Sequence, residues 1–461
     1  MRDLTLGKPF NNILRLAFPL LLCVLVEQSG MIDSFIAGRF LGEAALSAVG
    51  NATSVSAVFM LAAYGLNVGG AVVISRLFGA KRVSLLKETI YTLFVSGALL
   101  GVIIGIAGII LCKPILLLIN TPPEILQISA EFLSIYLCAL PAMYIFSISC
   151  GVFTALGDSL TPCLFLVGAN ILNIIMNFFS VWFTDWGVAG IAASKCFAQL
   201  ICAALIMLML NFKLRKIFGH SLKTRIMSPA VIKNLAANVV PAMLHSSVVS
   251  VGNLLIQAAV NPFGTSFIAG IALGGRINGF ASDCIDTVPD AHSAYAAQNI
   301  GAGRLERVKH GFGAGVILVL VLSAVFSAAF IFFSDFIIGI FLEDEISAAA
   351  VTSAKQYIKT AAAVYPLMGI KYLCDDVLRA AGRMKLYLLM AVNNLTLRVV
   401  LVYILLPFIG LNSVFIAWAA AISVSGTISI IIYKKGIWQN KLTKPDIISD
   451  NRIPDVVKLC V

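Results

Sequence analysis

Long apolar stretches recur along the whole chain and are separated by short polar segments. A helix of about 20 apolar residues is long enough to cross the hydrocarbon core of a bilayer. Stretches of this length run over residues 14–37, 46–75, 89–112, 133–154, 162–182 and 187–210, and then over 231–260, 266–297, 312–333, 357–378, 387–408 and 414–433. The pattern therefore predicts an all-α integral membrane protein with twelve transmembrane helices.

The composition agrees with a membrane location. Of the 461 residues, 60% are hydrophobic and only 12% are charged, whereas about 25% of residues in soluble domains are charged. The ten cysteines include no Cys-x-x-Cys pair, so they indicate neither a zinc site nor a disulfide framework. Because the chain also lacks a phosphate-binding loop, a His-x-x-x-His pair and a nucleophile-elbow serine, we predict no enzyme, no metal and no cofactor.

The net charge of +11 is explained by an unequal distribution of basic residues. With a cytoplasmic N-terminus, the inner segments contain most of the Lys and Arg residues, and the clear outer loops contain only Arg39 and Lys113. The positive-inside rule then places both termini in the cytoplasm and the protein in the cell membrane, with Lys355 and Lys359 as the main exceptions. The basic excess needs no nucleic-acid partner.

The second half of the chain repeats features of the first half. Small residues and prolines match at a spacing of 222 residues and, further along, of 225 residues: Pro19 with Pro241, Gly30 with Gly252, Gly79 with Gly301, Pro141 with Pro366 and Gly157 with Gly382. This indicates a duplicated six-helix unit. Because six is even, both copies cross the membrane in the same sense, and we expect two lobes related by a pseudo-two-fold axis along the membrane normal.

The repeat also predicts the domain organisation. We expect an N-terminal six-helix lobe over 1–211 and a C-terminal six-helix lobe over 231–433. A basic cytoplasmic linker over 212–230 joins them, and a cytoplasmic tail over 434–461 follows. Such a two-lobed protein is suited to moving a substrate across the membrane between its lobes.

Polar side chains in the first lobe form one candidate site. Asp33 lies one turn inside its predicted helix, and Asn170, Asn173 and Asn177 share one face of another helix by their i, i+3, i+7 spacing. Asn177 and Asp33 lie at similar depths, so we predict a proton or sodium site formed by Asp33, Asn173 and Asn177. The alternative is that the amides only join helices by hydrogen bonds. Glu27 and Asn170 are candidates for a substrate cavity.

The second lobe contains an acidic stripe of Asp283, Asp286 and Asp290. A charged side chain in mid-membrane costs about 2.5–3.5 kcal/mol on insertion scales, so these acids do not face lipid. Two interpretations remain open. The stripe lines a watery substrate cavity, or it pairs with cations such as Lys371 and Arg398.

Other charged residues in the predicted helices have local interpretations. Lys371 and Asp375 are four residues apart, which is typical of a structural ion pair within one helix. Lys195 and His245 stand alone in their helices, and we expect only local hydrogen bonds from them.

Four segments resemble motifs of the MATE family, the multidrug and toxic compound extrusion transporters. They are MIDSFIAGRFLGEAALSAVG after the first helix, TALGDSLTP after the fourth, NILNIIMNFFSVW in the fifth and AAQNIGAGRLERVKHG after the eighth. Asn177 stands where this family usually has Asp, and Phe178 where it usually has Pro. The second loop, SRLFGAKRVSLLKE, lacks the acid expected in the major facilitator superfamily, which also has twelve helices.

This resemblance implies a secondary active antiporter that exports organic compounds by alternating access. The expected cargo is small organic cations, and the expected coupling ion is H⁺ or Na⁺. We expect the protein to be a monomer in contact with membrane lipid. One branch of the family usually carries an acid where this chain has Met368, which argues against sodium binding at that position. The alternatives are a flippase for lipids or lipid-linked oligosaccharides from the same superfamily and, more distantly, a membrane-embedded enzyme.

Overall fold

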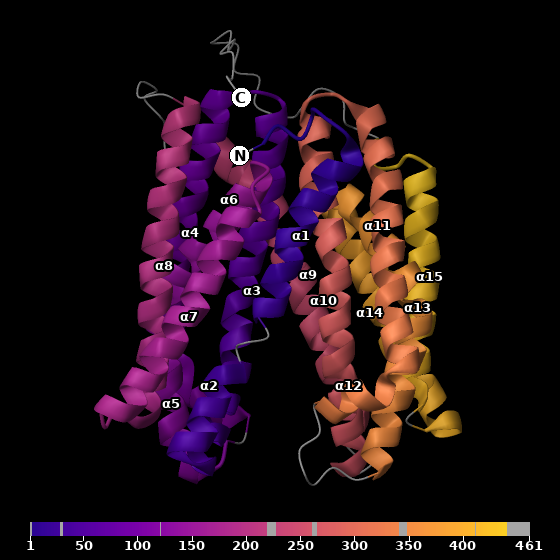
Figure 1. The fold of residues 1–461 in the computed structure, drawn as a ribbon. Helices are drawn as coiled ribbons and strands as arrows, with labels where there is room; N and C mark the ends of the chain where they lie inside the picture. The colour runs from indigo at the N-terminus through magenta and orange to yellow at the C-terminus, as the bar shows by residue number, and fades with distance from the viewer. Residues whose placement is uncertain are drawn as a thin grey trace. The chain divides into compact units, whose positions relative to one another are not determined.

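The computed structural model describes residues 2–27, 31–119, 121–218, 227–260, 265–340, 348–410 and 412–439. Within these ranges the chain is almost entirely helical and contains no strand (Figure 1). The all-α fold is therefore confirmed. The predicted tail beyond residue 439 and residues 219–226 of the predicted linker lie outside the described residues.

The helices follow one another with short connections. The first half contains α1 (Pro9–Glu27), α2 (Met31–Ile36), the π-helical turn η2 (Ala37–Leu41), α3 (Glu43–Gly79), α4 (Val83–Leu118), α5 (Pro123–Cys138), α6 (Leu140–Ala155), α7 (Leu160–Phe183) and α8 (Gly187–Phe218). The second half contains α9 (Pro229–Val260), α10 (Thr265–Gly301), α11 (Leu305–Phe332), α12 (Ser334–Ile340), α13 (Ala348–Ala380), α14 (Met384–Ile409) and α15 (Asn412–Lys434).

These helices account for the twelve predicted spans. Nine spans in the described chain are long and apolar enough to cross a membrane, and the pair α5 and α6, bent by 51° at Ala139, makes a tenth. The helices α10 and α13 have 37 and 33 residues and are also long enough. Polar and charged residues inside these two helices lower their hydropathy, which is why composition alone does not select them.

The chain divides into two compact units. Among the described residues, one contains Pro19–Met243, and the other contains Leu4–Phe18 together with residues 244–439. Both divisions fall inside helices, one in α1 at Pro19 and the other in α9 close to Pro241. A proline inside a helix removes one backbone hydrogen bond, so both divisions lie where the helix is weakened. The lobe boundaries expected from the sequence stay a prediction.

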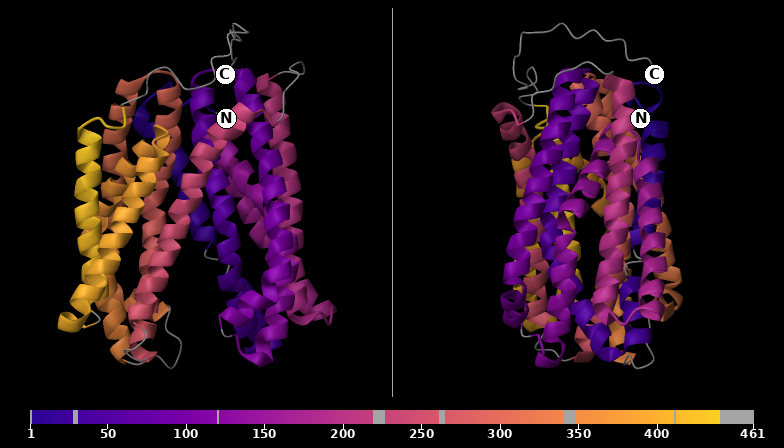
Figure 2. Two further views of the ribbon diagram at one scale, coloured as in Figure 1. Left: turned by 180° about the vertical axis from the view of Figure 1, so that it is seen from behind. Right: turned by 90° about the vertical axis from the view of Figure 1, so that its left-hand side faces the viewer.

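Each unit has its own helix packing. In the first unit, α3 packs against α4, α5 and α6, while α7 packs against α8. In the second unit, α13 packs against α10, α11 and α15, and α14 lies beside α15 (Figures 1 and 2). Close packing uses small residues, since a Cβ atom at Gly101 of α4 would lie only 2.8 Å from Cα of Pro141 at the bend between α5 and α6.

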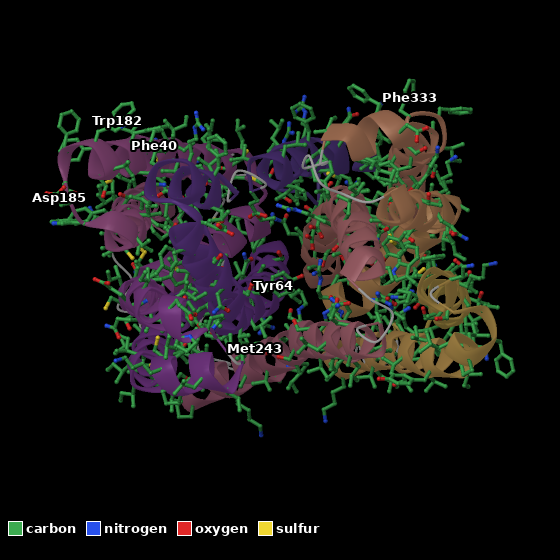
Figure 3. All side chains as sticks on the ribbon, turned by 90° about the horizontal axis from the view of Figure 1, so that it is seen from below. Phe40, Tyr64, Trp182, Asp185, Met243 and Phe333 are labelled. Atoms are coloured by element: carbon green, nitrogen blue, oxygen red, sulfur yellow. The ribbon has the colours of Figure 1, made fainter. Side chains whose placement is uncertain are left out.

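Aromatic side chains gather at one end of the first unit. Phe178 of α7 makes edge-to-face contact with Phe40, with ring centroids 5.9 Å apart, and lies 5.2 Å from Trp182. Figure 3 shows Phe40 and Trp182 on the same side of this unit, with Asp185 of the following turn nearby. Phe178, which departs from the usual proline, therefore packs into an aromatic group.

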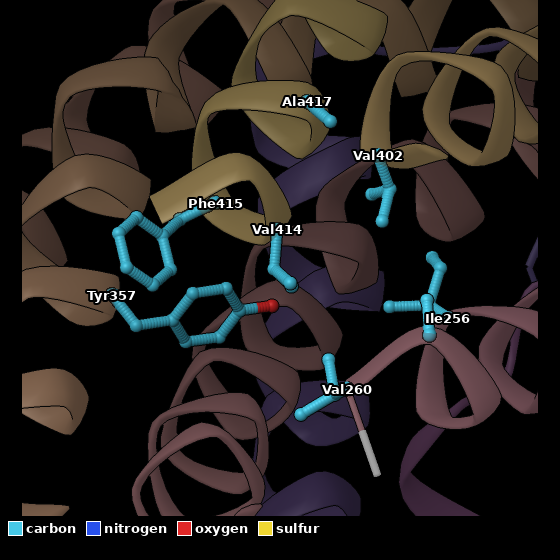
Figure 4. Close-up of a cluster of buried hydrophobic side chains, with 8 residues drawn as sticks. Ile256, Val260, Tyr357, Val402, Val414, Phe415 and Ala417 are labelled. Carbon is cyan, nitrogen blue, oxygen red and sulfur yellow. The ribbon is translucent and has the colours of Figure 1, made fainter. Parts of the chain in front are cut away.

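The second unit has an apolar core where four helices meet. It is formed by buried side chains from α9, α13, α14 and α15, namely Ile256, Ala259, Val260, Tyr357, Val402, Val414, Phe415 and Ala417 (Figure 4). The rings of Tyr357 and Phe415 meet at 60°, with centroids 5.8 Å apart. A Cβ atom at Gly274 of α10 would lie 2.7 Å from the Tyr357 ring, so glycine is needed for α10 to approach α13.

The last turn of α10 and Arg304, just after it, bind the segment that precedes α1. The backbone N–H of Leu4 donates to Gln298 Oε1 over 2.9 Å, and Asn299 Nδ2 donates to the Leu4 carbonyl over 3.3 Å. Arg304 donates to the carbonyl of Thr5 over 2.7 Å. The Gln-Asn motif and the arginine that follows it thus satisfy backbone groups of an irregular segment.

The turn between α6 and α7 is fixed by Asp158. Its carboxylate accepts hydrogen bonds from the Thr161 backbone and hydroxyl over 3.1 and 2.8 Å, and it forms a 2.6 Å ion pair with Lys213 of α8. Desolvation acts to raise the pKa of Asp158, but the bonds from Lys213 and Thr161 outweigh it and lower the pKa below its usual 3.8.

This ion pair makes stability depend on pH. A lowered folded-state pKa means that the pair contributes its full stabilisation above the ordinary pKa and loses it as the pH falls through the lower folded value. We expect Asp158→Asn to reduce the midpoint temperature of unfolding at neutral pH, and the difference from the wild type to shrink between about pH 5 and pH 3. Thermal unfolding of the purified wild type and variant over this pH range measures the midpoint temperature and its dependence on pH. Glu306→Gln, which breaks an exposed pair with Lys309, is the control and should change little; a pH-independent effect of Asp158→Asn contradicts this assignment.

Candidate functional site

The first unit places a buried carboxylate in the first turn of α2. The helix α1 ends at Glu27 and α2 begins at Met31, with Asp33 in its first turn and 3% exposed. The π-helical turn η2 follows and ends at Gly42, whose φ of 92° suits glycine. Departures from regular α-helix of this kind are frequent at functional sites.

The side chain of Asp33 is surrounded by three nitrogen donors. Its Oδ1 atom accepts hydrogen bonds from Nδ2 of Asn173 and Nδ2 of Asn177, each over 2.8 Å. Its Oδ2 atom accepts from Nζ of Lys195 over 2.7 Å. The structure thus brings together the three residues predicted as an ion site, and it adds Lys195 to them.

Lys195 was expected to bond only locally, and that expectation was wrong. Its partner, Asp33, lies on another helix and 162 residues away in sequence. A signal for this pairing was present in the α7–α8 hairpin. Asn177 lies eight residues before Asp185 and Lys195 ten residues after it, which at 1.5 Å per residue places both at depths of about 12–15 Å. A lone lysine at that depth needs an acid partner.

The contacts of Asp33 are all with hydrogen-bond donors. All three contacts are N–H donors, and a buried carboxylate is tolerated when it is paired and hydrogen-bonded. In the part of the chain that is described, the side-chain oxygens of Asn173 and Asn177 are buried and accept no hydrogen bond. The amides therefore face Asp33 with their nitrogens, while their oxygens stay unpartnered.

The two other residues predicted for the first-unit cavity lie apart from this set. Asn170 donates to the carbonyl of Leu166 in its own helix over 3.0 Å. Glu27 is the last residue of α1 and its side chain is exposed. Tyr136 of α5 is a neighbour that the sequence did not indicate, with its ring centroid 5.9 Å from Lys195 Nζ.

The acidic stripe of the second unit is only partly paired. Asp290 Oδ1 lies 2.6 Å from Arg379 Nη2, and the same nitrogen lies 2.6 Å from Oδ2 of Asp376. Asp283 is exposed and Asp286 half-buried, and neither forms a hydrogen bond or ion pair with another described residue. Arg379 is thus the cation that forms an ion pair with the stripe, through Asp290.

Neither cation named from the sequence pairs with this stripe. Lys371 forms the i, i+4 pair with Asp375 over 2.6 Å, as the sequence predicts, and Ser429 of α15 donates to the second oxygen of Asp375 over 2.6 Å. Arg398 donates to Asn253 over 3.1 Å. Both cations have nearer partners than the stripe on α10.

His245 also differs from its expected role. Its ring stacks on Tyr387 of α14 at 4.5 Å and 13° between planes. The guanidinium of Arg379 lies 5.9 Å from the same tyrosine ring. The imidazole therefore packs between helices.

Comparison with known proteins agrees with this architecture. The MatE family model matches residues 19–179 and 241–404, one segment in each half of the sequence repeat. The probable multidrug resistance protein YoeA of Bacillus subtilis is 25% identical over 79% of this chain and 80% of its own. The multidrug export protein MepA of Staphylococcus aureus is 23% identical over 90% of this chain and 91% of its own.

Solved structures show the same fold. An outward-facing MATE family transporter of the MOP superfamily superposes with a TM-score of 0.89 at 18% identity, covering 96% of this chain and 98% of that one. The bent form of the Vibrio cholerae MATE transporter VcmN gives a TM-score of 0.85 at 19% identity, covering 94% and 97%. With a family model matched over more than half of its length, the chain belongs to the MatE family of multi-pass membrane transporters.

Proposed function

We propose that this protein is a secondary active antiporter that exports organic compounds in exchange for H⁺ or Na⁺. The observation that carries the proposal is the buried Asp33 carboxylate, held by Asn173, Asn177 and Lys195 within a membrane-spanning unit. Relatives named for multidrug resistance and multidrug export support the substrate class. None of the relatives described above is named for lipid flipping.

Coupling follows from exchange of partners at Asp33. An ionised carboxylate attracts a cation or a proton, and a carboxylate neutralised by a proton releases a bound cation. An ion taken up by Asp33 competes with the three donors that now bind its two oxygens. Ion binding thus changes contacts between α2, α7 and α8, which gives the ion a means of biasing one conformation over another.

The second unit supports a cationic cargo. The side chains Asp283, Asp286 and Asp290 share one face of α10, and Arg379 pairs with one of the three. Since Arg379 is also bound to Asp376, an excess of negative charge remains on this face. We propose that it attracts organic cations.

The gradient-driven step is tested by Asp33→Asn. We expect at least a tenfold loss of cationic-dye efflux from everted vesicles, measured with pH and sodium gradients imposed separately, because the amide cannot ionise. Asp33→Glu should retain part of the activity. Asp158→Asn, an acid of the same unit outside the site, is the matched control and should pump normally. If the single variant does not fold, the double variant with Lys195→Gln removes both charges. Efflux at the wild-type rate by the Asn variant contradicts the coupling role.

The acidic stripe is tested by Asp286→Asn. Because Asp286 has no partner among the described residues, this change should alter which cations are exported while protein abundance stays near the wild-type level. Asp376→Asn provides the contrast, since it breaks a fully buried pair with Arg379, a loss of about 3–5 kcal/mol that should reduce the folded protein strongly. Transport assays with several cationic dyes measure selectivity, and the amount of protein in the membrane measures folding. Together they separate a change in cargo from a loss of folded protein. If Asp286→Asn instead fails to fold, the acidic stripe stabilises the fold and does not bind cargo.

We propose that both termini are cytoplasmic, from the distribution of Lys and Arg. In a cysteine-free version, cysteines at the exposed positions Arg215 and Lys309 should resist impermeant thiol reagents added to intact cells. A cysteine at Asp185 should be labelled from outside. The reverse labelling pattern overturns the orientation.

A further inference from the structure

Asp33 and the three polar residues bound to it carry no net charge when each has its usual ionisation. Asp33 contributes one negative charge and Lys195 one positive charge, and Asn173 and Asn177 are neutral. The side chain of Asp33 is only 5% exposed and that of Lys195 28%. The carboxylate therefore already has a counter-cation, which is part of the protein.

As they are oriented here, the amides offer no oxygen ligand to a hard cation beside Asp33. Sodium, like other hard cations, binds to oxygen ligands. Asn173 and Asn177 present N–H groups to Asp33, and their oxygens make no contact with any described polar group. The remaining carboxylate oxygen is bound by Lys195. The four residues thus form a donor set suited to an anion, with the cation position filled by the ammonium group.

We propose that Lys195 is a resident cation that takes the place of free sodium at Asp33, so that the proton is the ion exchanged in the first unit. This rests on the proposed function and specifies its coupling ion. Uptake of one proton by the Asp33 carboxylate breaks the ion pair and leaves Lys195 as a free ammonium. Loss of that proton on the other side of the membrane restores the pair. No other reactant is consumed.

The two unpartnered amide oxygens indicate that Lys195 prevents sodium from binding beside Asp33. A half-turn of each amide about its terminal bond would present Oδ1 of Asn173 and Oδ1 of Asn177 to the space beside Asp33. With Lys195 absent, the carboxylate and these two amide oxygens would form a set of oxygen ligands from three side chains, of the kind that binds hard cations such as Na⁺. Removal of the lysine charge should therefore convert a sodium-independent site into a sodium-binding one.

The experiment is thermal unfolding of the purified full-length protein in sodium chloride and in choline chloride at equal ionic strength. We expect no sodium-specific shift for the wild type. Lys195→Met should gain a saturable, sodium-dependent rise of about 2 °C or more, because an ion that binds only the folded state stabilises it. Lys195→Arg retains the charge and should resemble the wild type. Should Lys195→Met not fold, Lys195→Gln takes its place.

The chain offers a matched control for a lost ion pair. Lys213 pairs with Asp158 over 2.6 Å in the same unit, and its side chain is 27% exposed, close to the value for Lys195. Lys213→Met should lower stability without adding any response to sodium. Sodium stabilisation of the wild type, or an equal response in the two Met variants, overturns the proposal. Because unfolding requires no transport, this result is independent of whether the protein exports cationic dyes.

Discussion

A negative charge inside a membrane-spanning unit is the constraint on which the first unit depends. An unpaired carboxylate in an apolar interior is strongly destabilising, so its position is possible only where several donors converge. Two helices supply them to a carboxylate on a third. The helix α2 presents Asp33, one face of α7 presents Asn173 and Asn177, and α8 presents Lys195. A change in any of these helices alters the charge balance at the same carboxylate.

The second unit also pairs charged side chains within its helices, but with a different arrangement of partners. Arg379 of α13 lies between Asp290 and Asp376, and Lys371 of the same helix pairs with Asp375. Here one helix provides both cations and two of the acids, so the pairing is largely local. The first unit instead joins α2, α7 and α8 through a single carboxylate. Conformational coupling is therefore easier to build into the first unit, where the loss of one ionic contact changes the packing of three elements.

Helical periodicity explains how much of the site could be predicted. The spacing of Asn173 and Asn177 places them on one face, and depth within the span aligns them with Asp33, so the sequence indicates these three residues together. The partners of Lys195 and Arg379 depend on which helices are neighbours in three dimensions, and spacing within one helix contains no such information. The fold followed from apolar run lengths, although α10 and α13 have many polar residues and the bend between α5 and α6 depends on close packing against Gly101.

The closed pair between Asp33 and Lys195 also has an electrical consequence. Moving one elementary charge across a membrane potential of 100 mV changes its free energy by about 2.3 kcal/mol. A carboxylate and an ammonium 2.7 Å apart move through that field together, and their contributions cancel. Movement of these two residues together, without cargo or an additional ion, therefore transfers no net charge through the field.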